Sequence, residues 1–174
     1  MTSELAFRPV DPHDRTPIVT VFDGLSEHSR YLRYLGPKPR LSDAEIRYFT
    51  EVDHHDHEAI VVTAHDVAIG VARYVRRRED PTSADIAVEV VDRWQGRGVG
   101  SALLRRIARR AREEGVSSFH GTVLTSNRAM LATIDALAAP WRTTSREGPV
   151  LGIEIALDKK MIGRDGAAAT GWAA

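Results

Sequence analysis

The sequence of 174 residues has no cysteine and no excess of charge of either sign. Without cysteine, disulfides, thiolate metal sites and a cysteine nucleophile are excluded, and such a chain fits a reducing cytosol, so we expect a cytoplasmic protein. Lysine and arginine together number 24 and balance 24 acidic residues. A formal charge of zero argues against bulk binding to nucleic acid or to an anionic membrane surface.

Long apolar runs are missing as well. No stretch approaches the roughly 18 apolar residues that would suggest a membrane span. The start Met1-Thr2-Ser3-Glu4 is acidic and lacks the apolar region of a signal peptide, so we expect neither a leader nor a membrane anchor.

Metal-ligand patterns are scarce, and the one candidate is Asp53-His54-His55-Asp56-His57. Adjacent histidines on a regular element cannot all face one ion, and no downstream cluster completes a ligand set. We interpret this segment as a solvated loop and expect no metal.

The most informative stretch present is a glycine-rich turn, Asp92 to Ser101, between a strand pattern and a helix pattern. Residues 86–91 are β-branched and apolar, and residues 99–114 carry an apolar stripe at helical spacing. Glycines at alternate positions let the backbone turn tightly and approach a ligand. Because the first N–H groups of a helix lack internal partners, anions bind there. The turn therefore predicts a phosphate site.

Periodicity along the rest of the chain predicts one α+β domain over residues 1–157, with residues 158–174 as a loose tail. We expect helices at 15–23, 43–52, 99–114 and 127–138. Asp14 is the expected N-cap of the first helix, and the capping box Ser42 to Glu45 begins the second. Residues 25–36 form a short helix or an ordered loop. Strands are expected at 5–10, 59–64, 67–75, 84–91, 118–124, 141–146 and 150–157. The predicted order is β-α-α-β-β-β-α-β-α-β-β, antiparallel at first, with a parallel pair across the glycine-rich crossover.

Three phosphate-binding motifs compete for the turn. A dinucleotide fingerprint needs G-x-G-x-x-G, but Ser101 stands where the third glycine belongs. A P-loop needs a lysine after its last glycine, and none follows here. The third motif is Q/R-x-x-G-x-G/A, and Gln95-Gly96-Arg97-Gly98-Val99-Gly100 matches it.

That motif and the order of elements over residues 5–157 resemble the GCN5-related N-acetyltransferase (GNAT) superfamily. Asn127 stands where the family often has an asparagine that contacts coenzyme A. More narrowly, Leu25-Ser26-x-x-Ser29-Arg30-Tyr31 together with Asp92-x-Trp94-Gln95 resembles the acetyltransferase domain of bacterial Pat-type protein-lysine acetyltransferases. Those proteins often carry a further regulatory or synthetase-like domain, for which we expect no room in this chain.

The resemblance implies an N-acetyltransferase that moves the acetyl group of acetyl-CoA to a primary amine, on a protein lysine or a small molecule, by direct attack in a ternary complex. The alternative is a non-catalytic acyl-CoA sensor or interaction module. The resemblance also implies a set of donor contacts at the turn and on the strand before it, namely Val90, Val91, Gln95, Gly96, Arg97, Gly98, Val99, Gly100, Ser101 and Asn127. The helix arginines either reach the adenosine 3′-phosphate or form a solvated face: Arg105, Arg106, Arg109 and Arg110.

Two carboxylates are candidates for the general base, Asp85 and Glu89, which share one strand face at period two. The competing interpretations are a surface acid at the strand start for Asp85 and an ion pair with an arginine for Glu89. His120 is a further candidate base, although a structural histidine is the more common case. Ile134 replaces the tyrosine that the family often uses as general acid, so the acid is either water or another tyrosine: Tyr31, Tyr34, Tyr48 or Tyr74.

The acceptor side is left open by the sequence. By resemblance, the cationic and aromatic segment Arg30 to Tyr34 would line it. The identity of the amine, the preference among acyl groups, and the choice between monomer and homodimer stay undetermined at this point.

Overall fold

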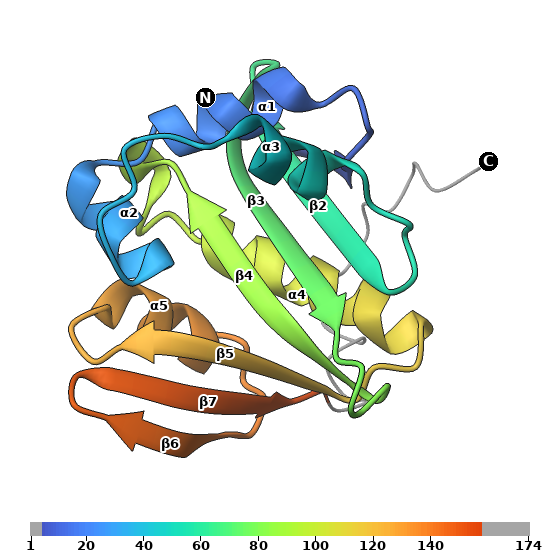
Figure 1. The fold of residues 1–174 in the computed structure, drawn as a ribbon, viewed down its shortest axis with the longest axis vertical. Helices are drawn as coiled ribbons and strands as arrows, with labels where there is room; N and C mark the ends of the chain where they lie inside the picture. The colour runs from blue at the N-terminus through green and yellow to red at the C-terminus, as the bar shows by residue number, and fades with distance from the viewer. Residues whose placement is uncertain (1–4, 158–174) are drawn as a thin grey trace.

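The computed structural model describes residues 5–157, which form one α+β domain around a seven-stranded sheet (Figure 1). The strand order across the sheet is β1-β2-β3-β4-β5-β7-β6. The strands are β1 Leu5–Pro9, β2 His57–Ala64, β3 Val67–Arg76, β4 Ser83–Val90, β5 Ser118–Leu124, β6 Trp141–Glu147 and β7 Val150–Ala156. The predicted tail at 158–174 lies outside the described residues.

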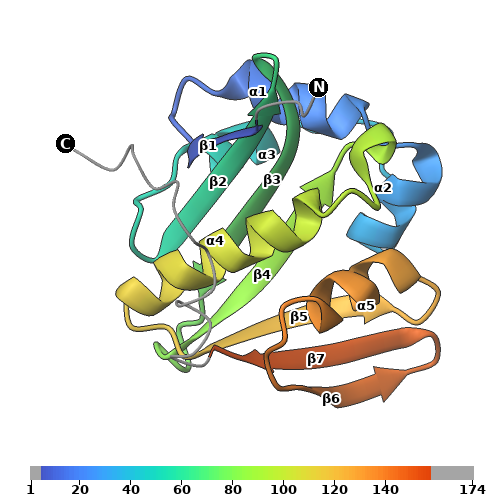
Figure 2. The same cartoon turned by 180° about the vertical axis from the view of Figure 1, so that it is seen from behind.

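Helices cover both faces of the sheet (Figures 1 and 2). They are α1 Arg15–Asp23, α2 Glu27–Tyr34, α3 Asp43–Thr50, the 3-10 turn η1 Asp92–Trp94, α4 Val99–Glu113 and α5 Arg128–Asp135. The apolar stripe of α4 is fully buried and packs with α5 on one face. On the other face α1 and α3 cover the first strands. None of the described helices combines the length and apolar character needed to cross a bilayer.

The predicted fold class is confirmed, with two changes near the N-terminus. The ambiguous segment is helical, because Ser26 accepts a hydrogen bond from the backbone N–H of Ser29 and so caps α2. Asp14 occupies the predicted N-cap position of α1, but its side chain bonds elsewhere. Its carboxylate accepts hydrogen bonds from Arg8 and from the backbone N–H of Asp11, and it makes no side-chain cap.

The two halves of the sheet diverge at one strand pair. Strands β1 to β4 form an antiparallel sheet, interrupted only by a register shift between β2 and β3 at Val62 and Thr63. Strands β4 and β5 are parallel, as predicted, but they pair only over Ser83–Asp85 and Ser118–His120. Beyond these three pairs the strands separate, and β5 continues instead with β7 and β6. The split between β4 and β5 positions the candidate site (Figure 1).

Candidate functional site

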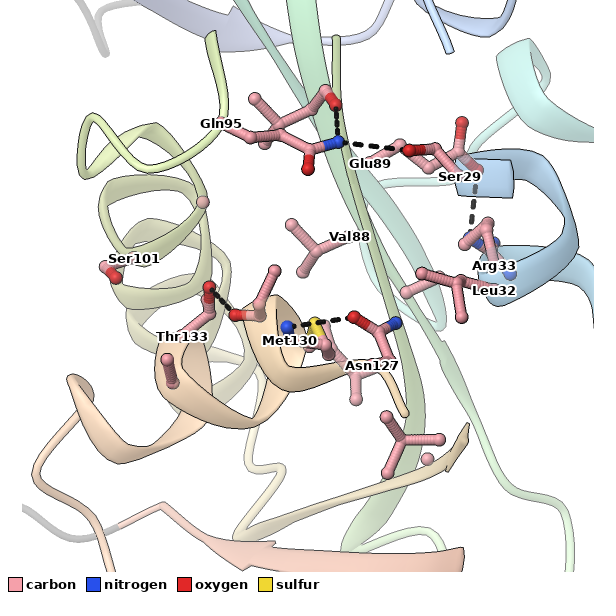
Figure 3. A pocket seen from close by; sticks show the side chains of 18 of the residues that line it. Ser29, Leu32, Arg33, Val88, Glu89, Gln95, Ser101, Asn127, Met130 and Thr133 are labelled. Atoms are coloured by element: carbon pink, nitrogen blue, oxygen red, sulfur yellow. Dashed lines mark hydrogen bonds and ion pairs between the residues drawn. The ribbon is translucent and has the colours of Figure 1, made fainter. Parts of the chain in front are cut away.

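A cleft of about 390 Å³ lies where β4 and β5 separate (Figure 3). One wall is β4 from Ile86 to Val90, and the other is β5 with α5. The glycine-rich turn lines one end, and α2 contributes Ser29, Leu32 and Arg33. A volume of this size suits the reactive arm of an extended ligand. The cleft therefore brings together the predicted phosphate turn, the strand before it and Asn127, which are far apart in the sequence.

The glycine-rich turn has the backbone geometry of an anion site. Gly96 and Gly98 have φ angles of +70° and +81°, a conformation that residues with a side chain rarely adopt. Helix α4 follows directly, and its first backbone N–H with an intrahelical acceptor is that of Ala102, bonded to the carbonyl of Gly98. Among the described residues no side chain caps this helix. The N–H groups of Val99 to Ser101 are therefore available to phosphate oxygens.

The side chain of Gln95 fixes the turn to its surroundings. Its Nε2 donates to the carbonyl of Val90 at 3.0 Å and to Asp92 at 3.2 Å, and it lies 3.5 Å from Ser29 Oγ on α2 (Figure 3). Arg97 is exposed and lies 5.3 Å from the centre of the Trp94 ring. Gln95 thus mainly stabilises the conformation of the turn, whereas Arg97 is placed to contribute a positive charge to a bound phosphate.

Strand pairing decides which backbone groups of β4 face the cleft. The N–H of Val91 donates to the carbonyl of Ile69 on β3 at 2.9 Å. Because alternate residues of a strand point their backbone groups to opposite edges, those of Val88 and Val90 point away from β3, toward the cleft. The Val90 carbonyl is already bonded to Gln95, which leaves the Val90 N–H as a donor. Val91 itself is buried under α1 and does not line the cleft, so the structure does not bring this predicted contact to the site.

Glu89 is a buried carboxylate at the cleft wall, with a side chain that is 5% exposed. Arg33 Nε lies 3.0 Å from its Oε1, and the hydroxyl of Tyr34 donates to the same oxygen at 3.1 Å. The ion pair considered from the sequence is therefore present, but its arginine comes from α2 and not from a neighbouring strand. Being paired does not remove Glu89 from the cleft, which it lines next to Val88 and Val90.

Asp85, the other candidate base, lies outside the cleft lining. Its side chain is 67% exposed, with Arg77 Nε 3.9 Å away. It stands beside His120 where β4 and β5 are still paired, at the closed end of the split. Four strand residues separate it from Glu89, a distance of about 13 Å at the usual rise. Neither Asp85 nor His120 lines the cleft, so the geometry favours Glu89 between the candidate bases.

Asn127 has two functions available to its side chain. Its Oδ1 accepts a hydrogen bond from the Met130 N–H at 3.1 Å and caps α5. The amide nitrogen is left for a ligand, and the residue lines the cleft opposite β4 (Figure 3). Ile134 is fully buried in the core between α5 and α4, so the position where the family often has a tyrosine does not reach the cleft.

Of the four tyrosines considered as general acids, only Tyr34 contacts a candidate base. Burial, and next to it the charge of Glu89, raises the pKa of the Tyr34 hydroxyl above its ordinary value of 10.0. Tyr74 is buried on the α4 face and donates to the backbone of His55. Tyr31 and Tyr48 are exposed.

The histidine-rich segment and the helix arginines have structural partners. His54 pairs with the buried Glu58, His55 pairs with Glu114, and the His57 ring stacks on Tyr48, so the three rings serve different neighbours. No group of potential metal ligands is found among residues 5–157.

Arg110 pairs with Glu58 and Glu114, and Arg106 stacks on Phe7. These two arginines therefore belong to the domain's own packing.

Several residues of the cleft were not anticipated from the sequence, namely Gly121, Thr122, Met130, Thr133 and Ile153. Met130 and Thr133 follow Asn127 at helical spacing, and that spacing is the one signal that could have found them. The others come from β5 and β7, whose approach to α5 is a tertiary property.

The family model "Acetyltransferase (GNAT) family" matches residues 25–136. The chain is 36% identical over 136 residues to an acetyltransferase Pat of Mycolicibacterium smegmatis, a match covering 77% of this chain and 40% of the relative. It therefore spans less than half the length of that curated relative.

Solved structures agree in fold. The GNAT domain of PAT from S. lividans is 33% identical, with a TM-score of 0.79 over 86% of this chain and 89% of that one. A Salmonella typhimurium protein whose structure includes its cofactor acetyl-CoA has a TM-score of 0.71 at 16% identity, covering 89% and 95% of the two chains, and shows the fold alone. The family-model match and the Pat relatives together show that this chain belongs to the acetyltransferase (GNAT) family, whose members are acetyl-CoA-dependent N-acetyltransferases.

Proposed function

We propose that this domain transfers the acetyl group of acetyl-CoA to a primary amine, with a protein lysine as the acceptor and Glu89 as the general base. The observation that carries the proposal is a buried carboxylate on the wall of a cleft whose end is an uncapped helix N-terminus. The two features supply the two requirements of the reaction, a held thioester and a proton acceptor near it.

The donor is held by the backbone. Phosphate oxygens of the pyrophosphate would accept from the free N–H groups of Val99, Gly100 and Ser101, with Arg97 as the added positive charge. The pantetheine arm would run along β4, whose edge is open beyond Asp85. The Val90 N–H points into the cleft and would donate to the thioester oxygen. Such a donor is worth about 3 kcal/mol when negative charge develops on that oxygen.

Glu89 would take a proton from the attacking ammonium group, whose pKa is about 10.4 for a lysine. The neutral amine then attacks the thioester carbon and forms the new C–N bond, and the C–S bond breaks as the thiolate of coenzyme A leaves. The second proton that the nitrogen loses to become a neutral amide passes to that thiolate or to solvent. A thiol has a pKa of about 8.5 in a model peptide, so its thiolate is a tolerable leaving group without strong assistance. This is consistent with a cleft that lacks a tyrosine at position 134.

The open front of β5, β7 and β6 supports a macromolecular acceptor. No helix covers this face of the second half of the sheet (Figure 1). It carries Thr122, Arg142 and Glu154, which alternate with the buried apolar residues of the same strands. An extended protein segment has room to lie there beside the cleft, and the resemblance to the PAT domain supports the same class of acceptor.

The direct test compares Glu89→Gln with Asp85→Asn, because both changes replace a carboxylate by an amide on the same strand face. Thiol release from acetyl-CoA would be measured with lysine-containing proteins and with a panel of small amines. We expect Glu89→Gln to lower kcat by about 100-fold or more near neutral pH and to recover partly at high pH, where the amine is already deprotonated. A Glu89→Gln enzyme as fast as the parent would overturn the assignment, and an equal loss in Asp85→Asn alone would transfer the role to Asp85.

The same assay separates the acceptor classes and the alternative function. Turnover with small amines but with no protein lysine would refute the acceptor we propose. The buried Ile134 is the observation that favours a non-catalytic acyl-CoA sensor. Tight coenzyme A binding without thiol release to any acceptor would support that alternative.

A further inference from the structure

Helix α2 is joined to the cleft by polar contacts more than by apolar packing. None of its residues is fully buried. Its connections to the site are the contact of Tyr34 with Glu89, the contact of Arg33 with Glu89 and the proximity of Ser29 to Gln95, the last two of which are drawn in Figure 3. Arg30 secures the helix on its outer side by donating to the carbonyls of Phe22 and Pro39. A helix attached in this way has its position set by the partners of its side chains.

Two polar groups of α2 lie beside the same oxygen of Glu89, Tyr34 through a hydrogen bond and Arg33 through an ion pair that is not a hydrogen bond. Arg33 Nε and the Tyr34 hydroxyl lie 3.0 and 3.1 Å from Oε1. Oε2 has no hydrogen-bond partner among the described residues 5–157. The carboxylate thus has one oxygen that contacts α2 and a second oxygen, Oε2, that remains to accept a proton.

The two donors are themselves held in place. The Tyr34 ring meets the buried Phe22 edge-on at a centroid distance of 5.9 Å. The Arg33 guanidinium lies 4.9 Å from the centre of the Tyr34 ring. The raised pKa of Tyr34 keeps its hydroxyl protonated across the working pH range, so it stays a donor.

A second guanidinium, that of Arg73, lies on the same side of the sheet as the carboxylate and interacts with it electrostatically without a hydrogen bond. Arg73 on β3 lies on the same sheet face as Glu89, because Glu89 pairs with Val71, two residues before it. Arg73 is 5% exposed, and its guanidinium stacks 3.7 Å from the centre of the Phe49 ring. Burial lowers the pKa of Arg73 to about 10, so it is still charged near neutral pH. One carboxylate therefore lies among two guanidinium groups.

We infer that Arg33 and Tyr34 are positioning residues for the acetyl transfer: they fix Glu89 through Oε1 and leave Oε2 as the oxygen that receives the amine proton. The inference rests on the proposed function of Glu89 as the base. Proton transfer requires the accepting oxygen within hydrogen-bond reach of the amine, and a displacement of about 1 Å can cost about 100-fold in rate. Tyr34 thus has a function different from the general acid that the family often places on the helix after β5.

The test uses Tyr34→Phe and Arg33→Met, with Tyr74→Phe and Arg40→Met as matched controls. Tyr74→Phe also removes one buried phenol hydrogen bond, of 2.9 Å, but on the opposite face of the sheet. Arg40 is exposed and lies outside the cleft lining. Steady-state kinetics over pH 5.5 to 10 would be measured for each variant, with thermal unfolding as the check on folding.

We expect Tyr34→Phe to lower kcat by about 10-fold and Arg33→Met by about 100-fold, with the KM for acetyl-CoA unchanged, because the donor is held by β4 and α4. The pH dependence of kcat should change as well, because a positive charge or a hydrogen bond next to the base has been removed. Arg33→Lys should restore part of the rate. The controls should keep the parent kcat and pH profile.

Three outcomes of these measurements would refute the positioning role, and they distinguish it from the assignment of Glu89 as the base. If Glu89→Gln is fully active, the base assignment falls, and the positioning role falls with it. If Glu89→Gln is impaired while Tyr34→Phe and Arg33→Met match their controls, Glu89 stands as the base and the positioning inference is refuted. If KM for acetyl-CoA rises with kcat and the pH profile unchanged, α2 acts on donor binding and the inference is also refuted. Should Arg33→Met fail to fold, Tyr34→Phe and Arg33→Lys still give the decision.

Discussion

The sharpest test of the donor site is Gly98→Asp, because the chain contains a matched control for it. Gly98 begins α4 with a φ angle of +81°, and Gly115 follows the same helix with a φ angle of +83°. A Cβ added at either position would meet no atom within 4 Å beyond its chain neighbours. The backbone strain of a non-glycine residue, about 1 kcal/mol, is therefore the same at both ends of the helix.

The two positions differ in what an added carboxylate would face. At position 98 it stands beside the N–H groups that would hold the pyrophosphate. Two unit charges about 4 Å apart interact by about 1 kcal/mol in water and about 4 kcal/mol near a protein surface. Taking a value between these limits, and with about 1.4 kcal/mol per factor of ten, we expect Gly98→Asp to weaken coenzyme A binding by about 100-fold.

The added charge at position 98, which should weaken coenzyme A binding, should not lower the folding stability of the ligand-free protein relative to Gly115→Asp. A negative charge at a helix N-terminus is favourable by about 0.3 to 1 kcal/mol and unfavourable at the C-terminus. The ligand-free Gly98→Asp protein should therefore unfold at a temperature equal to or above that of Gly115→Asp. Loss of binding in Gly98→Asp consequently cannot be attributed to unfolding.

The assay is calorimetric titration with coenzyme A and acetyl-CoA at two salt concentrations, and thermal unfolding without ligand. Gly98→Ala, which adds only a Cβ, separates steric from electrostatic effects and should lose less affinity than Gly98→Asp. Added salt should restore part of the affinity of Gly98→Asp. Equal coenzyme A affinity in Gly98→Asp and Gly115→Asp would refute the placement of the pyrophosphate at this turn.

Three further predictions concern the cap of α5, a buried ion pair and a buried histidine. Asn127→Asp keeps the cap of α5 but loses the amide donor, so we expect unchanged thermal stability with weaker acetyl-CoA binding; equal affinity would show that Asn127 only caps the helix. Arg110→Met leaves the Glu58 carboxylate, 1% exposed, with fewer partners, and should lower the free energy of unfolding in urea by about 3 kcal/mol; a loss below about 1 kcal/mol would contradict this. Burial lowers the pKa of His57 from 6.5 to about 4, so the unfolded chain binds the extra proton and stability should fall as the pH drops from 6.5 toward 4, by up to about 1.4 kcal/mol per pH unit. His57→Gln should remove that slope in unfolding curves, and an unchanged slope would assign it to other groups.

The sequence by itself determined the local features of the donor site. Glycine spacing and the apolar stripe behind it specify a tight turn and a helix whose first N–H groups are free, and both depend on residues close together in the chain. The capping box at Ser42 and the helix from Val99 formed as predicted for the same reason. Asp14 occupies the predicted N-cap position, but its carboxylate bonds to Arg8 on the preceding strand and not to the helix, a contact that local pattern does not encode.

Only the tertiary structure decided which side chains form the acceptor side of the candidate site. Asp85 and Glu89 are equivalent in the strand pattern, and they differ because β4 and β5 pair at one and have separated at the other. The contact between Tyr34 and Glu89 joins residues 55 positions apart, which no local periodicity encodes. Arg33 is an ordinary helix arginine in the sequence, and it becomes part of the site only because α2 is held against the split sheet. Local chemistry therefore specifies the glycine-rich turn where we propose that the donor binds, whereas the divergence of two strands determines which carboxylate lines the cleft.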